Sequence, residues 1–134
     1  MLKHAERLRG VDLNLAKVVS HAAGILPFDL QLIEGLRTVE RQREYYAQGR
    51  TKPGKIVTST MASLHISGRA VDVAPLQADG SIDWEKTSDF DVMANAMFEA
   101  AKVVGVRIRW GADWDKDGKL RERGESDSPH FELA

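Results

Sequence analysis

Residues 63–72 read Ser-Leu-His-Ile-Ser-Gly-Arg-Ala-Val-Asp, and the apolar run that ends this stretch continues to residue 76. This run predicts a strand over residues 70–76. Side chains alternate between the two faces of a strand, so we expect Val71 and Val73 to enter the core while Asp72 faces the opposite side. A carboxylate between two core valines would be held on a rigid element, as a metal ligand should be.

A second polar stretch, Asp-Ser-Pro-His at residues 127–130, adds an acid and a histidine near the end of the chain. We expect a short final strand there, with His130 on its polar face. Catalytic zinc takes three protein ligands and leaves a fourth position for water, so His65, Asp72 and His130 form a candidate set. A nearby carboxylate that does not bind the metal, such as Asp127, can accept the proton of that water.

Each of these residues also has an ordinary structural explanation. A single histidine on a strand is usually a surface residue or a hydrogen-bonded one, and Asp72 could be a partly solvated strand residue. The joint pattern is much more specific than its parts. The chain contains no cysteine, so any metal site must be built from histidine and carboxylate.

Composition indicates one ordinary globular domain over residues 1–134, because 43% of the residues are hydrophobic and 29% are charged. Lys and Arg number 19 against 20 Asp and Glu, a net charge of −1 that gives no reason to expect a nucleic-acid partner. No stretch approaches the roughly twenty apolar residues of a membrane span. The charged start, Met-Leu-Lys-His-Ala-Glu-Arg, lacks the apolar region of a secretory signal.

The spacing of apolar residues predicts a mixture of helices and strands. Helices are expected over residues 11–23, 39–48 and 88–104, and strands over 28–36, 70–76, 106–110 and 129–133. Thr38 and Ser88 are expected to cap helices, and Gly24, Gly49 and Gly105 to end them. This pattern predicts an α+β fold in which a small, mainly antiparallel sheet packs against helices and carries the zinc site on its face.

The two polar motifs together resemble a known family. Ser63-x-His65-x-x-Gly68-x-Ala70-x-Asp72, followed by Asp127-x-x-His130-Phe131-Glu132, resembles the pattern of the zinc D-alanyl-D-alanine carboxypeptidase and dipeptidase superfamily. Within it, the chain most resembles the L-alanyl-D-glutamate endopeptidases of phage endolysins and bacterial cell-wall hydrolases. The resemblance spans about residues 30 to 134 and includes Gly35-Leu-Arg-Thr38, Gln42, Gln48-Gly-Arg-Thr51 and Pro53-Gly54.

The resemblance implies roles for individual residues. It makes His65, Asp72 and His130 the zinc ligands, and Asp127 the general base and then the general acid. Zinc would lower the pKa of its bound water toward about 7, so that hydroxide becomes available near neutral pH.

Two further residues acquire roles from the resemblance. Arg37 corresponds to an arginine near the scissile carbonyl, where a fixed cation could stabilise the oxyanion; the alternative is a solvated charge between strand and helix. Ser63 corresponds to a position that helps to hold substrate; the alternative is a loop residue whose hydroxyl caps local backbone.

The expected function is therefore hydrolysis of the peptidoglycan stem peptide at the L-Ala–D-Glu bond by a monomeric phage endolysin. Lacking a signal peptide, it would be made in the host cytoplasm and would reach the wall through a holin-type route, with neither nucleic acid nor membrane as partner. Two alternatives stay open: a D-Ala-D-Ala carboxypeptidase or dipeptidase, and a non-enzymatic binding module stabilised by zinc.

A second metal site is suggested by Asp113-Trp-Asp115-Lys-Asp117-Gly118. Its carboxylates stand at positions 1, 3 and 5 of an EF-hand loop with glycine at position 6, and hard oxygen ligands favour Ca²⁺ over Zn²⁺. Position 12 is Gly124 instead of glutamate. The alternative interpretation is a solvated acidic loop with a turn at its glycine.

Overall fold

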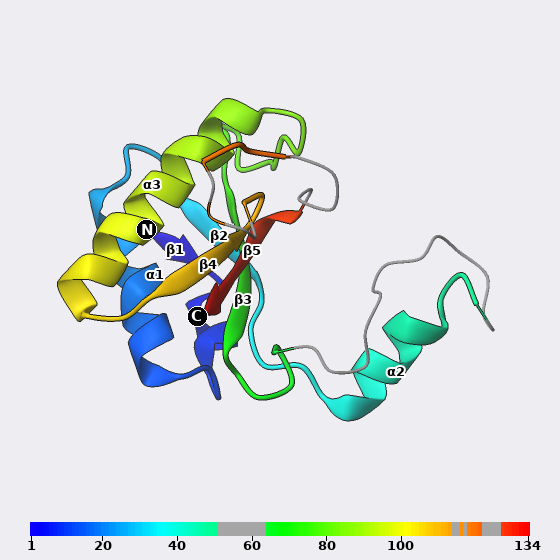
Figure 1. The fold of residues 1–134 in the computed structure, drawn as a ribbon. Helices are drawn as coiled ribbons and strands as arrows, with labels where there is room; N and C mark the ends of the chain where they lie inside the picture. Colours follow the sequence, from blue (N-terminus) through cyan, green and yellow to red (C-terminus); the bar gives the residue numbers. More distant parts are fainter. Residues whose placement is uncertain (51–63, 114–115, 117, 122–126) are drawn as a thin grey trace.

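The computed structural model describes residues 1–50, 64–113, 116, 118–121 and 127–134. In chain order the elements are β1 (Leu2–Lys3), the 3-10 helix η1 (Ala5–Leu8), α1 (Leu13–Ile25), β2 (Leu30–Glu34), α2 (Val39–Ala47), β3 (Ala70–Pro75), α3 (Thr87–Val104), β4 (Ile108–Gly111) and β5 (Asp127–Leu133) (Figure 1). No helix in the described part of the chain is long and apolar enough to cross a membrane.

The sheet has five strands in the order β1-β2-β3-β5-β4. The β1–β2 pair is parallel, and the other three pairs are antiparallel. Helices α1 and α3 pack on each other beside the sheet, whereas α2 stands apart from it (Figure 1). The expected α+β fold with a mainly antiparallel sheet is confirmed.

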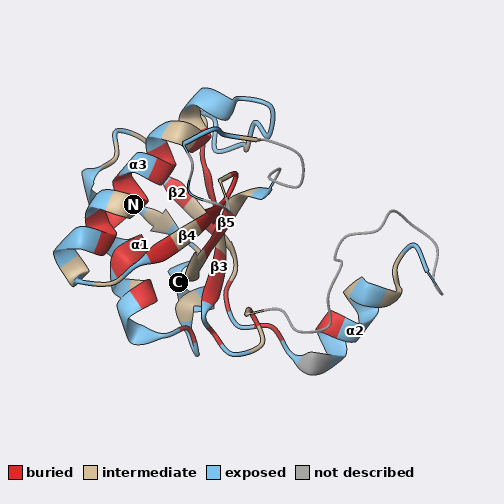
Figure 2. Ribbon diagram, viewed as in Figure 1, coloured by how far each residue is buried: buried red, intermediate tan, exposed pale blue. Residues whose placement is uncertain are grey.

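The core lies between the sheet and the pair formed by α1 and α3 (Figure 2). Its largest fully buried apolar side chains come from both layers: Leu15, Val18 and Val19 of α1, Phe90, Met93 and Met97 of α3, and Leu30, Leu32, Val71 and Phe131 of the sheet. Burying one such side chain stabilises the fold by about 1.5–3 kcal/mol. Val71 and Val73 of β3 are both fully buried, so their predicted inward positions are confirmed.

The predicted helix ends are confirmed in part. Thr38 caps α2 by accepting a hydrogen bond from the Arg41 amide, and Gly105 ends α3 with a φ of 89°. Gly24 does not stop α1, which runs on to Ile25. A glycine inside a helix is tolerated where neighbouring side chains are packed, at a cost of about 1 kcal/mol.

The prediction that Ser88 caps α3 is wrong. The helix already begins at Thr87, and its N-cap residue, Lys86, makes no side-chain capping bond. The Asp89 amide donates to the Lys86 carbonyl, so the first turn closes before Ser88 could act as a cap. Strand bounds also shift: β2 is shorter than expected, β4 begins at Ile108, and β5 begins at Asp127 because that residue pairs with Gly111.

Candidate metal centre

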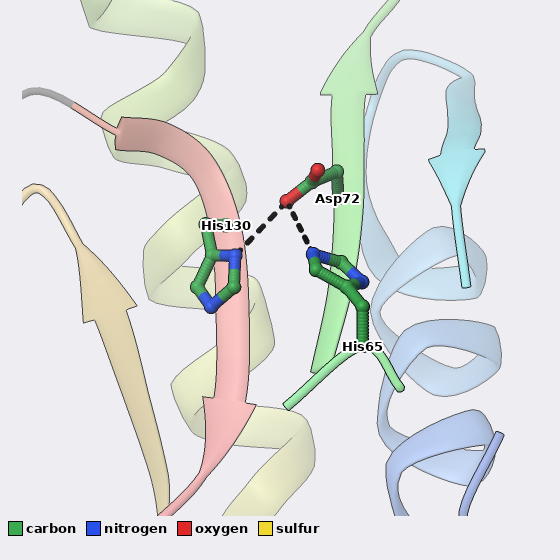
Figure 3. A group of neighbouring side chains, drawn as sticks. All are labelled: His65, Asp72 and His130. Atoms are coloured by element: carbon green, nitrogen blue, oxygen red, sulfur yellow. Dashed lines mark hydrogen bonds and ion pairs between the residues drawn. The ribbon is translucent and has the colours of Figure 1, made fainter. Parts of the chain in front are cut away.

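Three side chains from separate segments converge on one face of the sheet (Figure 3). Asp72 on β3 is the direct register partner of His130 on β5, and His65 lies in the turn that precedes β3. The Asp72 Oδ1 atom is 3.4 Å from His65 Nε2 and 3.1 Å from His130 Nδ1. One atom from each residue can be chosen so that all lie within 4.8 Å of one another.

This geometry fits a tetrahedral metal ion. Zinc bonds of 2.0–2.2 Å to nitrogen and oxygen place neighbouring ligand atoms about 3.3–3.5 Å apart, close to the two measured separations from Asp72. Both histidines are buried, so their side of a bound ion would be shielded from solvent by the protein. Two imidazoles and one carboxylate also leave a coordination position open, as catalytic sites require.

The second nitrogen of each histidine already has an oxygen partner. His65 Nδ1 lies 3.0 Å from the Gly35 carbonyl oxygen, and His130 Nε2 lies 2.9 Å from Glu132 Oε1. When these nitrogens donate their protons, the lone pairs of His65 Nε2 and His130 Nδ1 face Asp72. Such outer partners fix the tautomer and the ring orientation of metal-binding histidines.

The sequence motifs assigned no role to Glu132 or to the Gly35 carbonyl. Glu132 had a signal that could have found it, because residues two apart on a strand share a face, and His130 was already a candidate. Glu132 is itself paired, since Arg109 Nη2 lies 3.1 Å from its Oε2 atom. No sequence signal could have identified the Gly35 carbonyl, because every residue has a backbone carbonyl group.

The turn that positions His65 is enclosed by the beginning of the chain. Gly68 has a φ of +72°, and a Cβ atom there would lie 2.3 Å from the Gly10 carbonyl oxygen. The Asp12 amide donates to the Gly68 carbonyl, and the Arg37 amide donates to the His65 carbonyl, each at 2.9 Å. Glycine is needed at position 68 both for its left-handed backbone and for the close approach.

Arg37 is buried and fixed, so its interpretation as a solvated charge is wrong. Its Nε and Nη2 atoms donate to the two carboxylate oxygens of Glu34 at 2.9 and 2.7 Å, and its Nη1 atom donates to Gln42 Oε1 at 2.6 Å. Burial opposes the charge of Arg37, but Glu34 outweighs burial and raises the pKa of the guanidinium. The side chain is a permanent, rigid cation.

Asp127 lies at the open side of the cluster. Its Oδ2 atom is 3.8 Å from His130 Nδ1, and its side chain is about half exposed. Partial burial and the negative charge of Asp72 raise the pKa of Asp127 above its ordinary value. A carboxylate whose pKa is raised accepts a proton more readily, which suits a general base.

Asp72 and His130 favour each other's charged forms. Burial opposes ionisation of Asp72, but when the facing nitrogens of His130 and His65 carry the protons instead, their hydrogen bonds hold the pKa of Asp72 well below the ordinary range. Burial likewise opposes the charge of His130, and Asp72 raises the pKa of that imidazole. A metal cation in the same place would favour the carboxylate by the same electrostatic effect.

The pattern of one protein family, described as phage L-alanyl-D-glutamate peptidase, matches residues 2–134. The chain belongs to this family. It is therefore an enzyme of the peptidase class, and the resemblance drawn from its two motifs is confirmed.

Two named relatives share most of the length of this peptidase. The L-alanyl-D-glutamate peptidase of Escherichia phage T5 is 33% identical over 136 residues, which cover 98% of this chain and 96% of the relative. The peptidoglycan L-alanyl-D-glutamate endopeptidase CwlK of Bacillus subtilis is 35% identical over 124 residues, covering 88% of this chain and 68% of the relative.

Solved structures share the fold. The Serratia marcescens L-Ala D-Glu endopeptidase ChiX superposes with a TM-score of 0.76 at 34% identity, over 96% of this chain and 84% of that one. The vancomycin resistance D,D-pentapeptidase VanY, solved in complex with Zn(II), gives a TM-score of 0.56 at 15% identity, over 92% of this chain and 72% of that one. The second likeness concerns the architecture alone.

Several predicted site residues lie outside the described part of the peptidase: Ser63 of the substrate prediction, and Asp115 and Asp117 of the calcium prediction. Asp113 is described, and its Oδ2 atom accepts a hydrogen bond of 3.2 Å from the Gly118 amide. Both interpretations of the acidic loop remain predictions.

Proposed function

We propose that this peptidase is a zinc enzyme that hydrolyses the L-Ala–D-Glu bond of the peptidoglycan stem peptide. The observation that carries the proposal is the convergence of His65, Asp72 and His130, with Asp127 beside them on the open side. The names of the relatives from phage T5, Bacillus subtilis and Serratia marcescens support the choice of bond.

The chain supplies a complete set of donors for the ion. His65 Nε2, Asp72 Oδ1 and His130 Nδ1 would hold zinc, with their orientation fixed by Gly35 and Glu132. Zinc held there would supply Lewis acidity, which polarises a carbonyl group and lowers the pKa of water toward neutrality.

Asp127 moves the proton in this mechanism. Its carboxylate accepts a proton from the attacking water and later donates it to the leaving amine nitrogen, so that the group returns to its starting state. The partial exposure of Asp127 leaves room for water and substrate beside it.

Arg37 stabilises the negative charge that develops on the carbonyl oxygen. Three of its N–H groups are used by Glu34 and Gln42, and an arginine has five. Two therefore remain for an oxyanion, and because Arg37 is already fixed, little reorganisation accompanies the reaction. Ser63 is proposed to contact the substrate.

The biological setting is part of the same proposal. The whole chain, residues 1–134, would act as one monomeric catalytic domain on peptidoglycan, with no nucleic-acid or membrane partner. As a phage endolysin it would be made in the host cell and would reach the cell wall by a holin-type route. Calcium at Asp113, Asp115 and Asp117 would be detected by calorimetry on the zinc-loaded protein; no heat and no thermal shift at millimolar calcium would remove that idea.

Digestion of purified sacculi tests the activity. We expect new amino termini at D-Glu in mass spectra of the products, loss of activity with a chelator and recovery with zinc. Release of free D-alanine instead would identify a D-Ala-D-Ala carboxypeptidase. A zinc-loaded protein that binds sacculi without cutting them would be a binding module.

A further inference from the structure

A shallow groove of about 720 Å³, largely open to solvent, lies in the segment that connects β3 to α3, and residues 77–79 and 81–85 line it. The segment leaves the sheet at the C-terminal end of β3. Because β3 and β5 are antiparallel, β5 begins with Asp127 at this same end of the sheet (Figure 1). Gln77 lies five positions after Asp72 in the chain, and a strand rises about 3.3 Å per residue, so the groove begins at most roughly 16 Å from Asp72.

Trp84 is the aromatic surface of this groove. It is 54% exposed although it is among the largest apolar side chains. Its ring stacks on buried Phe90, with ring centroids 5.9 Å apart and an angle of 25° between the planes. Because Phe90 supports one face of the indole, the ring is held in place while much of its surface remains open to a ligand.

The polar groups of the groove are rigid and accept hydrogen bonds. Asp79 Oδ1 accepts from the amide and the hydroxyl of Ser81 at 2.9 and 2.6 Å, and Asp83 Oδ1 accepts from the Glu85 amide at 3.1 Å. Backbone bonds of 2.8 Å from the Gln77 amide to the Ser81 carbonyl and of 2.9 Å from the Gly80 amide to the Gln77 carbonyl close the turn. A preformed site of this kind loses little entropy when it binds.

The charge of the groove restricts the ligand. Asp79, Asp83 and Glu85 are acidic, and no Lys or Arg is among the lining residues. One cation borders the groove, because Lys86 Nζ donates to Oε1 of the lining residue Gln77 at 3.4 Å. The same Nζ atom lies 3.4 Å from Asp89 Oδ2, which offsets its charge. Carboxylates accept hydrogen bonds and do not donate them. The groove therefore disfavours anions, and its acceptors beside the Trp84 ring suit a ligand with many hydroxyl donors and one apolar face.

We propose that this groove binds a sugar ring of the peptidoglycan glycan strand, stacked on Trp84. This inference rests on the proposed function, because the glycan is joined to the amino side of L-alanine and so begins one residue from the proposed scissile bond. A chain residue spans at most about 3.6 Å, and successive sugars extend the reach toward the groove. The glycan would thus anchor the stem peptide at the metal centre.

Binding is tested with soluble oligomers of N-acetylglucosamine, which carry no peptide. We expect isothermal titration to detect binding to the wild-type protein, and Trp84→Leu, which keeps apolar cover over Phe90, to weaken it by at least about tenfold. Tyr46→Leu removes another exposed aromatic ring, on α2, and should change nothing. Absence of wild-type binding at millimolar oligomer, equal binding by Trp84→Leu, or a preference for a diamine over the oligomer would overturn the proposal.

A second measurement separates this inference from the proposed function. The rate on intact sacculi divided by the rate on a soluble stem peptide without sugar should fall at least about tenfold in Trp84→Leu. An unchanged ratio would overturn the inference while the peptidase activity stands. Oligomer binding that depends on Trp84, in a protein that cuts neither substrate, would support the groove and refute the proposed activity.

Discussion

At the scale of single residues, the orientation of His130 depends on Glu132, whose carboxylate lies 2.9 Å from the nitrogen that faces away from Asp72. Glu132→Ala should lower zinc affinity roughly 10–100-fold, because the imidazole loses the partner that fixes its tautomer. Competition with a metal indicator measures this. Glu99→Ala, which removes an exposed carboxylate of α3, serves as control, and equal affinities of the two variants would contradict the assignment.

Asp127 is predicted to act as a general base and not as a metal ligand. Asp127→Ala should keep a full equivalent of zinc but lose at least about a hundredfold in kcat, the scale of a lost general base. Metal analysis and kinetics on a stem peptide give the two readouts. If a zinc-loaded variant keeps its activity, the base lies elsewhere; Glu125, outside the described residues, is then the next candidate.

The types and spacing of side chains in the sequence were enough to predict the candidate metal ligands, but not the residues that orient them. His65, Asp72 and His130 were found because few residue types bind metals and strand alternation places two of them on one face. The bidentate Glu34–Arg37 pair was not predicted, because glutamate near arginine is common on solvated surfaces. Only the fold reveals that both side chains are mostly buried.

At the scale of elements, the turn that follows β3 should respond to pH through Asp79. Hydrogen bonds from Ser81 lower the pKa of Asp79 below its ordinary value. A depressed pKa means that the carboxylate stabilises the turn fully above the unfolded pKa, about 3.9, and that this stabilisation is lost as pH falls through the folded value. NMR titration of the Asp79 carboxyl carbon measures the midpoint. Ser81→Ala should move it upward, and an unchanged midpoint would contradict the assignment.

Elements with long periodic patterns were predicted well and short ones poorly. The apolar stripe of α3 and the alternation in β3 carry enough buried side chains to fix type and face. Strand β1, with two residues, has no pattern to detect and exists because it pairs with Leu30 and Gln31. The predicted end of α1, at residue 23, is two residues too early, because the sequence does not reveal that Ala22 and Ala23 are buried.

At the scale of the whole molecule, the proposed ion would join the turn before β3 to two neighbouring strands. Removing it with a chelator should lower Tm, and excess zinc should restore it, because a ligand of the folded state at about 1,000 times its Kd stabilises by about 4.1 kcal/mol. Scanning calorimetry measures both states. His65→Ala should lack most of the zinc response, and an equal response in that variant would place the ion elsewhere.

The strand order has a consequence for biosynthesis. Strand β5 is made after every other strand, yet it lies inside the sheet, between β3 and β4. Until it leaves the ribosome, β4 has no partner in the sheet and Asp72 has no histidine opposite it. Before β5 joins the sheet, the chain therefore cannot assemble the full proposed ligand set, and loading of the proposed metal ion would follow the insertion of β5.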